Sequence, residues 1–401
     1  MQLLKPADLP DNFTRSLYKI APYRGCGHGC RYCDGRAERY YVEGDFERDV
    51  VIREDIPELL AADLRKVRER GFVAFGSGTT DPYQPLEASE DITGRCAALL
   101  AARADDAAQG RARFALPAMV MTKSALALRD LPLWRRVNAA SGFLLMVSIT
   151  SLDEELRAAM EPGASGFAER LSLLKSFKES GCAVGALAMP FLPGLSDDEG
   201  SIRALYEAVS SIGVDFVMAG GVTLRPGRQK DFYLNALAAY RPDLLERTRA
   251  LFSNEKESGA PWSSATKDLR ARIAHVSRDF GLPWLLPHAI YSRILPAHDS
   301  LRLLLRDMLE LYGARGIDTA ALRASADRYD AWLVAQRRAF RRRRNEGYRV
   351  LEEALPRAEA SGELEKVLDN PRLSRFVGAI VREGAVFDYR SLRLLGEKSS
   401  H

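Results

Sequence analysis

Cysteine is scarce in this chain, with five residues among 401. So few cysteines do not suggest a disulfide framework. Long apolar runs are also missing, and no stretch approaches the roughly 18 residues that would predict a membrane-spanning helix. The first residues, Met1–Pro6, show neither a long apolar region nor a signal cleavage pattern. We therefore expect a cytoplasmic protein with no membrane segment.

Charge of one sign is not in large excess, because 58 Lys and Arg residues against 54 Asp and Glu residues give a formal net charge of +4. So small a charge says little about nucleic acid binding. Histidine is rare, and the four histidines other than His28 are scattered and suggest no site. With 46% hydrophobic and 28% charged residues, the composition is typical of a soluble globular protein with a sizeable core.

Three of the five cysteines lie within eight residues, in the run Cys26-Gly-His-Gly-Cys30-Arg-Tyr-Cys33. Thiolates so close together repel one another unless a metal holds them. Three thiolates leave a tetrahedral zinc site one ligand short, and His28 is the candidate for the fourth. The spacing fits poorly with the paired C-x2-C patterns of zinc sites. Three thiolates on a four-iron cluster would leave one iron open for a substrate.

The pattern C-x3-C-x-aromatic-C, with Tyr32 as the aromatic residue, resembles the signature of the radical S-adenosylmethionine (SAM) superfamily. The resemblance implies that Cys26, Cys30 and Cys33 hold a [4Fe-4S] cluster whose open iron binds SAM through its amino and carboxylate groups. It implies that the reduced cluster cleaves SAM to a 5′-deoxyadenosyl radical. A flavodoxin- or ferredoxin-type reductant is implied as partner. We expect His28 to hydrogen-bond the loop or the cluster edge.

Six short apolar stretches alternate with amphipathic segments, which predicts buried parallel strands joined by helical crossovers. Six units are too few for a closed eight-fold barrel, and they match the partial (β/α)6 barrel of the radical SAM type that the resemblance implies. Chemistry in such a barrel lies at the carboxyl ends of the strands. The predicted strands are Leu17–Tyr23, Phe72–Ser77, Ala118–Thr122, Phe143–Ile149, Ala183–Phe191 and Asp215–Val222.

The pattern becomes helical after about residue 226. We expect an N-terminal segment (1–16), the partial barrel (17–296), C-terminal helices packed on the barrel (297–350) and a small helical appendage (351–401). Ser151 and Ser196 each precede a glutamate by three residues, just after a predicted strand, and this spacing predicts two capping boxes.

The second predicted strand leads into the run Gly76–Glu87, which contains Thr80-Asp81-Pro-Tyr83. Physics alone favours a strand followed by a Pro-rich turn. Beside the cysteine loop, however, the hydroxyl and carboxylate groups can accept from the SAM ammonium. The run resembles that of the spore photoproduct lyase-like branch of the superfamily. The resemblance makes Thr80 and Asp81 candidate SAM contacts and Tyr83 a candidate catalytic residue.

Three further strand ends carry candidate SAM contacts. Lys123 follows the third strand and resembles the family's lysine that pairs with the SAM carboxylate, although a lysine there is usually a solvated terminus. Ser148 ends the fourth strand at a position that the family uses for SAM. Pro190, in the fifth strand, would help to wall the adenine. Glu161-Pro162 also matches the branch.

Two positions depart from the DNA-repair members of the branch. Those members carry a hydrogen-donating cysteine where this sequence has Gly78, and a tyrosine where it has Asp34. We therefore expect a substrate other than the spore photoproduct. For Asp34, an ion pair with Arg36 or Arg39 and a catalytic contact with the substrate both remain possible interpretations. Cys96 and Cys182 are expected to be small core residues.

The run 337–344 holds six arginines and is the strongest charge cluster of the chain. Its simplest interpretation is a solvated basic helix face. A phosphate-binding stripe for nucleic acid is the functional interpretation. The alternative to an enzyme is thus a nucleic-acid-binding protein with a structural or redox-sensing iron–sulfur cluster. Such a protein would have no use for Thr80, Asp81, Lys123 and Ser148.

Overall fold

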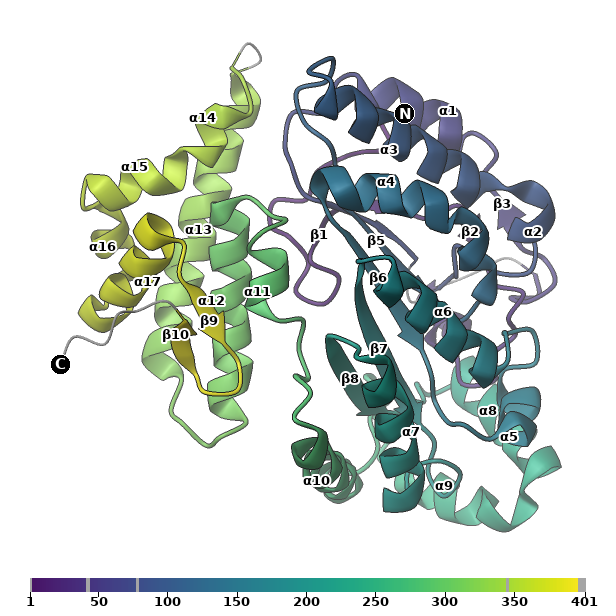
Figure 1. Cartoon of the computed structure of the whole chain (residues 1–401). Coiled ribbons are helices and arrows are strands. Elements are labelled where there is room, and N and C mark those ends of the chain that lie inside the picture. Colours follow the sequence, from purple (N-terminus) through teal and green to yellow (C-terminus); the bar gives the residue numbers. More distant parts are fainter. Residues whose placement is uncertain (1, 41–43, 77–78, 344–345, 396–401) are drawn as a thin grey trace.

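The fold is seen in a computed structural model that describes residues 2–40, 44–76, 79–343 and 346–395. Six parallel strands form one sheet, and their spatial order follows the chain (Figure 1). The predicted α/β class and partial barrel are confirmed, with strand bounds within a few residues of those expected. The strands are β1 (Ser16–Ile20), β4 (Phe72–Phe75), β5 (Ala118–Thr122), β6 (Phe143–Ser148), β7 (Ala183–Phe191) and β8 (Phe216–Gly221).

Helices cover the outer face of this sheet, because alternate strand residues such as Val73, Val120 and Leu145 point outward and are fully buried. The largest side chain in this layer, Trp134, stacks on Phe143 at 4.8 Å between ring centroids. The helices are α1 (Ile56–Leu64), α3 (Ile92–Ala108), α4 (Leu131–Ser141), α6 (Phe167–Glu179), α7 (Glu199–Ile212) and α10 (Ser263–Phe280).

The inner face of the sheet is closed by the segment that follows α10. Met119 and Met146 on the inner face belong to one apolar cluster with Tyr291 of α11 (His288–Tyr291) and Leu303 of α12 (Ala297–Gly313). The barrel interior is therefore filled from the C-terminal side of the chain. The carboxyl ends of the strands are left open by this packing, and a cavity forms there.

The cysteine loop lies in the segment that connects two short strands, β2 (Tyr23–Arg24) and β3 (Val51–Ile52). These two strands pair antiparallel. Around the same end of the barrel lie further short helices. They are α2 (Glu87–Glu90), α5 (Glu154–Met160), α8 (Arg228–Tyr240), α9 (Leu245–Leu251) and the 3-10 turns η1 (Asp34–Arg36), η2 (Glu38–Tyr40), η3 (Ala125–Asp130) and η4 (Pro242–Leu244).

The two predicted capping boxes are wrong. The N-cap of α5 is Asp153, whose carboxylate accepts from the backbone N–H groups of Glu155 and Leu156. The N-cap of α7 is Asp198, which accepts from the N–H of Ser201. An aspartate directly before each helix competes better for these donors than a serine two residues earlier. Ser196 instead accepts from the backbone N–H of Leu192.

The C-terminal part lies beside the barrel (Figure 1). Residues 351–395 are mostly helical, but Val386–Asp388 and Arg393–Leu395 form an antiparallel hairpin that the sequence did not predict. Phe387 of this hairpin shares one apolar cluster with Leu305, Tyr329, Leu355 and Val377 of the C-terminal helices. The remaining elements are α13 (Ala320–Arg342), α14 (Arg349–Glu352), α15 (Ala354–Ala360), α16 (Glu363–Leu368), α17 (Pro371–Glu383), β9 (Val386–Asp388) and β10 (Arg393–Leu395). Across the described residues, no helix is both long and apolar enough to span a membrane.

Candidate functional site

A cavity of about 320 Å³ opens at the carboxyl ends of the strands. The cysteine loop forms one wall, and the ends of β4 to β8 supply the rest. Ten of the eleven site residues predicted from the sequence line it, namely Cys26, Cys30, Tyr32, Cys33, Asp34, Thr80, Asp81, Lys123, Ser148 and Pro190. The eleventh, Tyr83, does not. Thr223, just after β8, also lines the cavity and was not predicted.

The cysteine loop is tightly turned. Gly25 and Gly29 have φ angles of 89° and 63°, which side chains rarely adopt. A Cβ on Gly25 would also lie 2.8 Å from the backbone oxygen of Phe46, so this position requires glycine for its conformation and for its close contact. The backbone N–H of Cys26 donates to Phe46 O at 2.9 Å, and that of Cys33 donates to Cys30 O at 3.3 Å. These bonds hold the three sulfurs on the cavity side of the loop.

Two buried glutamines fix the loop from opposite sides. Gln84 Oε1 accepts from the N–H of Gly27 at 2.7 Å, and its amide nitrogen donates to Gly25 O at 3.3 Å. Gln229 of α8 donates to the carbonyls of Tyr32 and Thr223 at 2.9 and 2.8 Å. Both glutamines are completely buried. Sequence reasoning missed them, and only the place of Gln84 inside the Thr80–Glu87 run was a signal.

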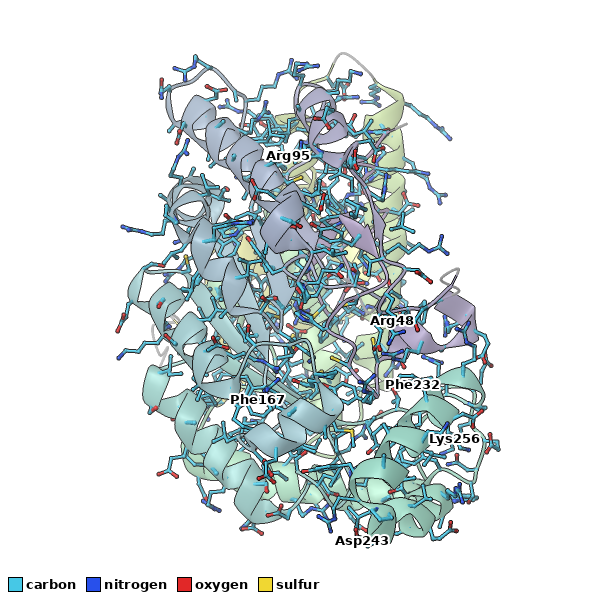
Figure 2. The ribbon with its side chains drawn as sticks, turned by 90° about the vertical axis from the view of Figure 1, so that its right-hand side faces the viewer. Arg48, Arg95, Phe167, Phe232, Asp243 and Lys256 are labelled. Carbon is cyan, nitrogen blue, oxygen red and sulfur yellow. The ribbon has the colours of Figure 1, made fainter. Side chains whose placement is uncertain are left out.

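The outer side of the loop is held by an arginine. Arg36 Nε donates to Cys30 O at 3.0 Å, and its Nη2 pairs with Glu47 at 2.6 Å. Its guanidinium lies 3.7 Å from the ring centroid of Phe232, which is labelled in Figure 2. Arg36 is therefore occupied by the loop and Glu47.

Burial keeps the three thiols neutral when no metal is bound. Burial raises the pKa of Cys30 to about 12, and nearby Glu161 adds to the rise. Burial also raises the pKa values of Cys26 and Cys33. Metal binding must therefore displace protons from these sulfurs.

The loop cysteines do not form a compact group of metal-ligand atoms. Among the described residues, the one group of three or more His, Cys, Asp or Glu side chains with ligand atoms mutually within 4.8 Å is Glu87, Asp91 and Asp130. Arg129 pairs with all three carboxylates of this group at 2.7 to 2.9 Å and accounts for it.

Asp81 is the centre of a buried network. It accepts from Thr122 Oγ1, from the N–H of Lys123 and from the N–H of Tyr83, each at 2.8 Å. His28 Nε2 lies 3.1 Å from Asp81 Oδ2, and its Nδ1 lies 2.9 Å from Gly163 O. Although burial opposes ionisation, His28 and these donors lower the pKa of Asp81. A buried carboxylate thus ties β4, β5 and the cysteine loop together.

Lys123 follows β5 and lines the cavity close to the cysteine loop. Its Nζ lies 3.7 Å from Glu161 Oε1 and 5.8 Å from the ring centroid of Tyr32. The Tyr32 hydroxyl in turn donates to Glu161. Lys123 is therefore not the solvated strand end of the simpler interpretation, since its side chain is 15% exposed.

The remaining predicted contacts occupy separate walls. Thr80 Oγ1 donates to Gly25 O at 2.8 Å, so it braces the loop as well as lining the cavity. Ser148 lies at the end of β6, and its hydroxyl bonds to no residue in the described part of the chain. Pro190 lines the cavity from β7.

A sequence model of the Radical SAM superfamily matches residues 20–205, which span the cysteine loop and the ends of β4 to β7. A protein of Mycobacterium tuberculosis (strain ATCC 25618 / H37Rv), described as uncharacterized, is 31% identical over 240 residues, 59% of this chain and 67% of that protein. The chain belongs to the radical SAM superfamily. It is an enzyme of that superfamily, and the family implies a [4Fe-4S] cluster and SAM.

Two further similarities are more distant. A protein of Acidianus two-tailed virus, also described as uncharacterized, is 28% identical over 213 residues, 48% of this chain and 63% of that protein. The solved structure of spore photoproduct lyase complexed with dinucleoside spore photoproduct is similar with a TM-score of 0.49 and 16% identity. That similarity covers 69% of this chain and 77% of that one.

Asp34 has a different partner from those expected in this radical SAM chain. It lies 3.5 Å from Arg225 Nε and accepts from Thr223 Oγ1 at 3.3 Å. The expected pairing with Arg36 or Arg39 is wrong, because Arg36 pairs with Glu47 and the loop after β8 brings Arg225 to Asp34. Asp34 still faces the cavity and is 34% exposed.

Tyr83 is displaced from the site that its motif predicted. Its ring is completely buried, its hydroxyl donates to Asp130 at 2.9 Å, and Trp134 Nε1 donates to it at 2.8 Å. The Tyr83 hydroxyl therefore makes its hydrogen bonds within the outer core and not in the cavity. Tyr83 is therefore not placed to act as a catalytic residue. Gly78, the position of the missing thiol, lies outside the described residues.

The arginines of the run 337–344 pair largely with acidic residues of the same chain. Arg337 is completely buried and pairs with Glu69 and Asp299 at 3.1 and 2.6 Å. Arg341 pairs with Asp8 and Glu69, both at 2.7 Å. Arg344 lies outside the described residues. Side chains fixed in this way have little charge left for phosphates, so the nucleic-acid alternative gains no support from this helix.

Proposed function

We propose that this chain reductively cleaves SAM at a [4Fe-4S] cluster held by Cys26, Cys30 and Cys33. The product is a 5′-deoxyadenosyl radical, which acts on a substrate other than the spore photoproduct. The observation that carries this proposal is the single cavity that joins three convergent cysteines to the ends of five strands. No zinc or purely structural cluster needs a lysine, a serine hydroxyl and an apolar wall at that place.

The residues present fit both groups. The three cysteines line one cavity, and three thiolates on a four-iron cluster leave one iron open for SAM. When bound, the cluster supplies the electron that breaks a carbon–sulfur bond of SAM. Lys123 would pair with the SAM carboxylate, and the Ser148 hydroxyl, which bonds to no described residue, would hydrogen-bond SAM. Thr80 and Asp81 would hold the adjoining wall, with Pro190 against the adenine.

At the rim, Asp34 is the candidate for contact with the substrate. Its pair with Arg225 fixes the carboxylate at the edge of the cavity. In that place it would orient a hydroxyl of the substrate or accept a proton from it. The order of motifs supports membership in the spore photoproduct lyase-like branch. A flavodoxin- or ferredoxin-type reductant and a reducing, cytoplasmic compartment are part of the proposal.

The test begins with anaerobic reconstitution and measurement of SAM binding and 5′-deoxyadenosine formation under a chemical reductant. Lys123→Ala should keep the cluster and weaken SAM binding about tenfold to a hundredfold, since one charge-assisted contact is worth about 1.5–3 kcal/mol. Stoichiometric zinc, with no iron–sulfur absorption after reconstitution, would refute the proposal. An unchanged dissociation constant in Lys123→Ala would remove only the lysine from the SAM site.

A further inference from the structure

Glu161 is a buried carboxylate in the wall behind Lys123. It follows α5 and is 1% exposed. Burial by itself would raise its pKa, but Lys123 and Arg170 lower it to about 2, so the group is ionised at neutral pH. Buried ionised carboxylates are uncommon unless they are paired, so the partners of this one indicate its role.

The two oxygens of Glu161 have different partners. Oε2 accepts from Arg170 Nη2 at 2.5 Å. Oε1 accepts from the Tyr32 hydroxyl and from Thr150 Oγ1, the latter at 3.2 Å. Lys123 Nζ approaches the same Oε1 at 3.7 Å. One oxygen thus anchors the carboxylate, and the other faces both the cysteine loop and the lysine.

Arg170 makes the anchor rigid. It is completely buried, and it also donates from Nε to Ser165 O at 2.8 Å and from Nη1 to Ser148 O at 3.0 Å. Its guanidinium lies 4.8 Å from the ring centroid of Phe167, which is labelled in Figure 2. Every nitrogen of Arg170 is therefore occupied, and it neutralises Glu161 without reaching the cavity.

The ammonium of Lys123 lies near Glu161 but is not hydrogen-bonded to it. At 3.7 Å its ammonium is attracted to Glu161 but is too distant for a normal hydrogen bond. No described residue accepts a hydrogen bond from this ammonium, so its three N–H donors can serve an anionic group in the cavity. Because Arg170 already balances Glu161, the lysine charge is also not cancelled.

We propose that Glu161 is a positioning residue that holds Lys123 in place for the SAM carboxylate and joins it, through Tyr32, to the cluster loop. This inference rests on the proposed function. Simple electrostatics predicts the opposite effect, since removing a negative charge near the SAM carboxylate should tighten binding. A purely structural role predicts lower stability with no selective loss of SAM affinity. The three interpretations therefore predict different changes in SAM affinity when Glu161 loses its charge. A positioning role predicts weaker binding, simple electrostatics predicts tighter binding, and a purely structural role predicts no selective change.

The experiment is a double-mutant cycle on the reconstituted, full-length protein, with Glu161→Gln, Lys123→Met and the double variant. The dissociation constant of SAM, the iron content and the electron paramagnetic resonance spectrum of the reduced cluster with and without SAM are measured. Glu155→Gln, on the exposed face of α5, is the matched control.

We expect Glu161→Gln to bind SAM about tenfold more weakly at full iron content. In the Lys123→Met background the same change should alter the affinity less than twofold, because its effect passes through the lysine. The SAM-induced change in the cluster spectrum should weaken in Glu161→Gln and stay normal in Glu155→Gln. Tighter SAM binding by Glu161→Gln, or equal losses in both backgrounds, would overturn the proposal.

Glu161→Asp covers the case in which Glu161→Gln loses iron or fails to fold. It keeps the charge that Arg170 needs but withdraws the carboxylate from Lys123 by one methylene. We expect full iron content and weakened SAM binding, and wild-type affinity in this variant would overturn the proposal. If the wild-type protein holds its cluster but does not bind SAM, the proposed function itself fails.

Discussion

Gln84 Oε1 accepts a hydrogen bond from the backbone N–H of Gly27 at 2.7 Å, across 57 positions of the chain. The bond joins the turn after β4 to the middle of the cysteine loop. Gln229 makes the equivalent connection from α8 to Tyr32 O at 2.9 Å. The shape of the loop is therefore set by amides that are themselves buried and fully bonded. Such groups are costly to remove, because the partner left behind stays buried without a bond.

The first prediction concerns the role of the five cysteines. Replacing Cys26, Cys30 or Cys33 by Ala should abolish cluster binding and SAM cleavage, while wild-type protein should bind about four irons and four sulfides. Cys96 is completely buried in α3 and Cys182 is buried just before β7, so their Ala variants should keep the cluster. Iron and sulfide assays check this. Loss of iron in Cys96→Ala, without unfolding, would contradict it.

The second prediction tests the glutamine that holds the loop. Gln84→Leu keeps the approximate size but leaves the N–H of Gly27 buried without a partner, at a cost of about 1–3 kcal/mol. We expect the cluster to be lost to a chelator at least several-fold faster than in wild type. Gln109→Leu, at the exposed end of α3, is the control and should behave as wild type. Equal rates for the two variants would show that the loop does not depend on Gln84.

The third prediction follows from the low pKa of Glu161. Its pKa of about 2 in the folded chain lies below the ordinary value of 4.5. A lowered folded-state pKa contributes stability that is present above the unfolded-state value and is lost as the pH falls from about 4.5 towards 2. The loss from this group is on the order of 3 kcal/mol.

Denaturant unfolding of cluster-free protein at stepped pH measures that loss. Glu161→Gln should start less stable at pH 6 and lose less of its stability on acidification than wild type. Parallel pH profiles for the two proteins would show that the carboxylate is not stabilised by its partners.

The fourth prediction concerns the arginines of α13. Arg337→Met leaves Glu69 and Asp299 as buried carboxylates without this partner, and breaking such a pair costs about 3–5 kcal/mol. Arg342 is exposed, so Arg342→Met should change the free energy of unfolding by about 0.5 kcal/mol or less. Denaturant titration compares them. A steep salt dependence of DNA or RNA binding that Arg342→Met abolishes would restore the nucleic-acid alternative.

The fifth prediction is that the enzyme does not repair the spore photoproduct. The thiol that returns a hydrogen atom in that chemistry has no counterpart, because the two cysteines outside the loop are buried away from the cavity. Asp34 occupies the place of the tyrosine that relays it. Reduced, cluster-replete enzyme with SAM and a spore photoproduct dinucleotide should form 5′-deoxyadenosine with little repair. Multiple-turnover release of thymidylyl-thymidine would contradict this.

The sequence by itself determined the parts of this protein that depend on local spacing. The cysteine pattern fits within eight residues, and the strand–helix alternation follows from the hydrophobic period of each segment. The parallel sheet then had to bring Asp81, Lys123 and Ser148 to one edge, since parallel strands share their carboxyl ends. These features needed no knowledge of which distant side chains meet.

Only the tertiary structure decided the partners of each group. Asp34 met Arg225 instead of Arg36, Tyr83 turned into the outer core, and Glu161 reached Arg170, Tyr32 and Lys123 at once. Such contacts depend on the directions in which side chains leave turns and helices that are far apart in the chain. Hydrogen bonds and ion pairs tolerate errors of only a few tenths of an ångström in the distance between their atoms. Residue type and spacing do not fix directions so closely, which is why the roles of the buried glutamines and the partners of Glu161 became visible only in three dimensions.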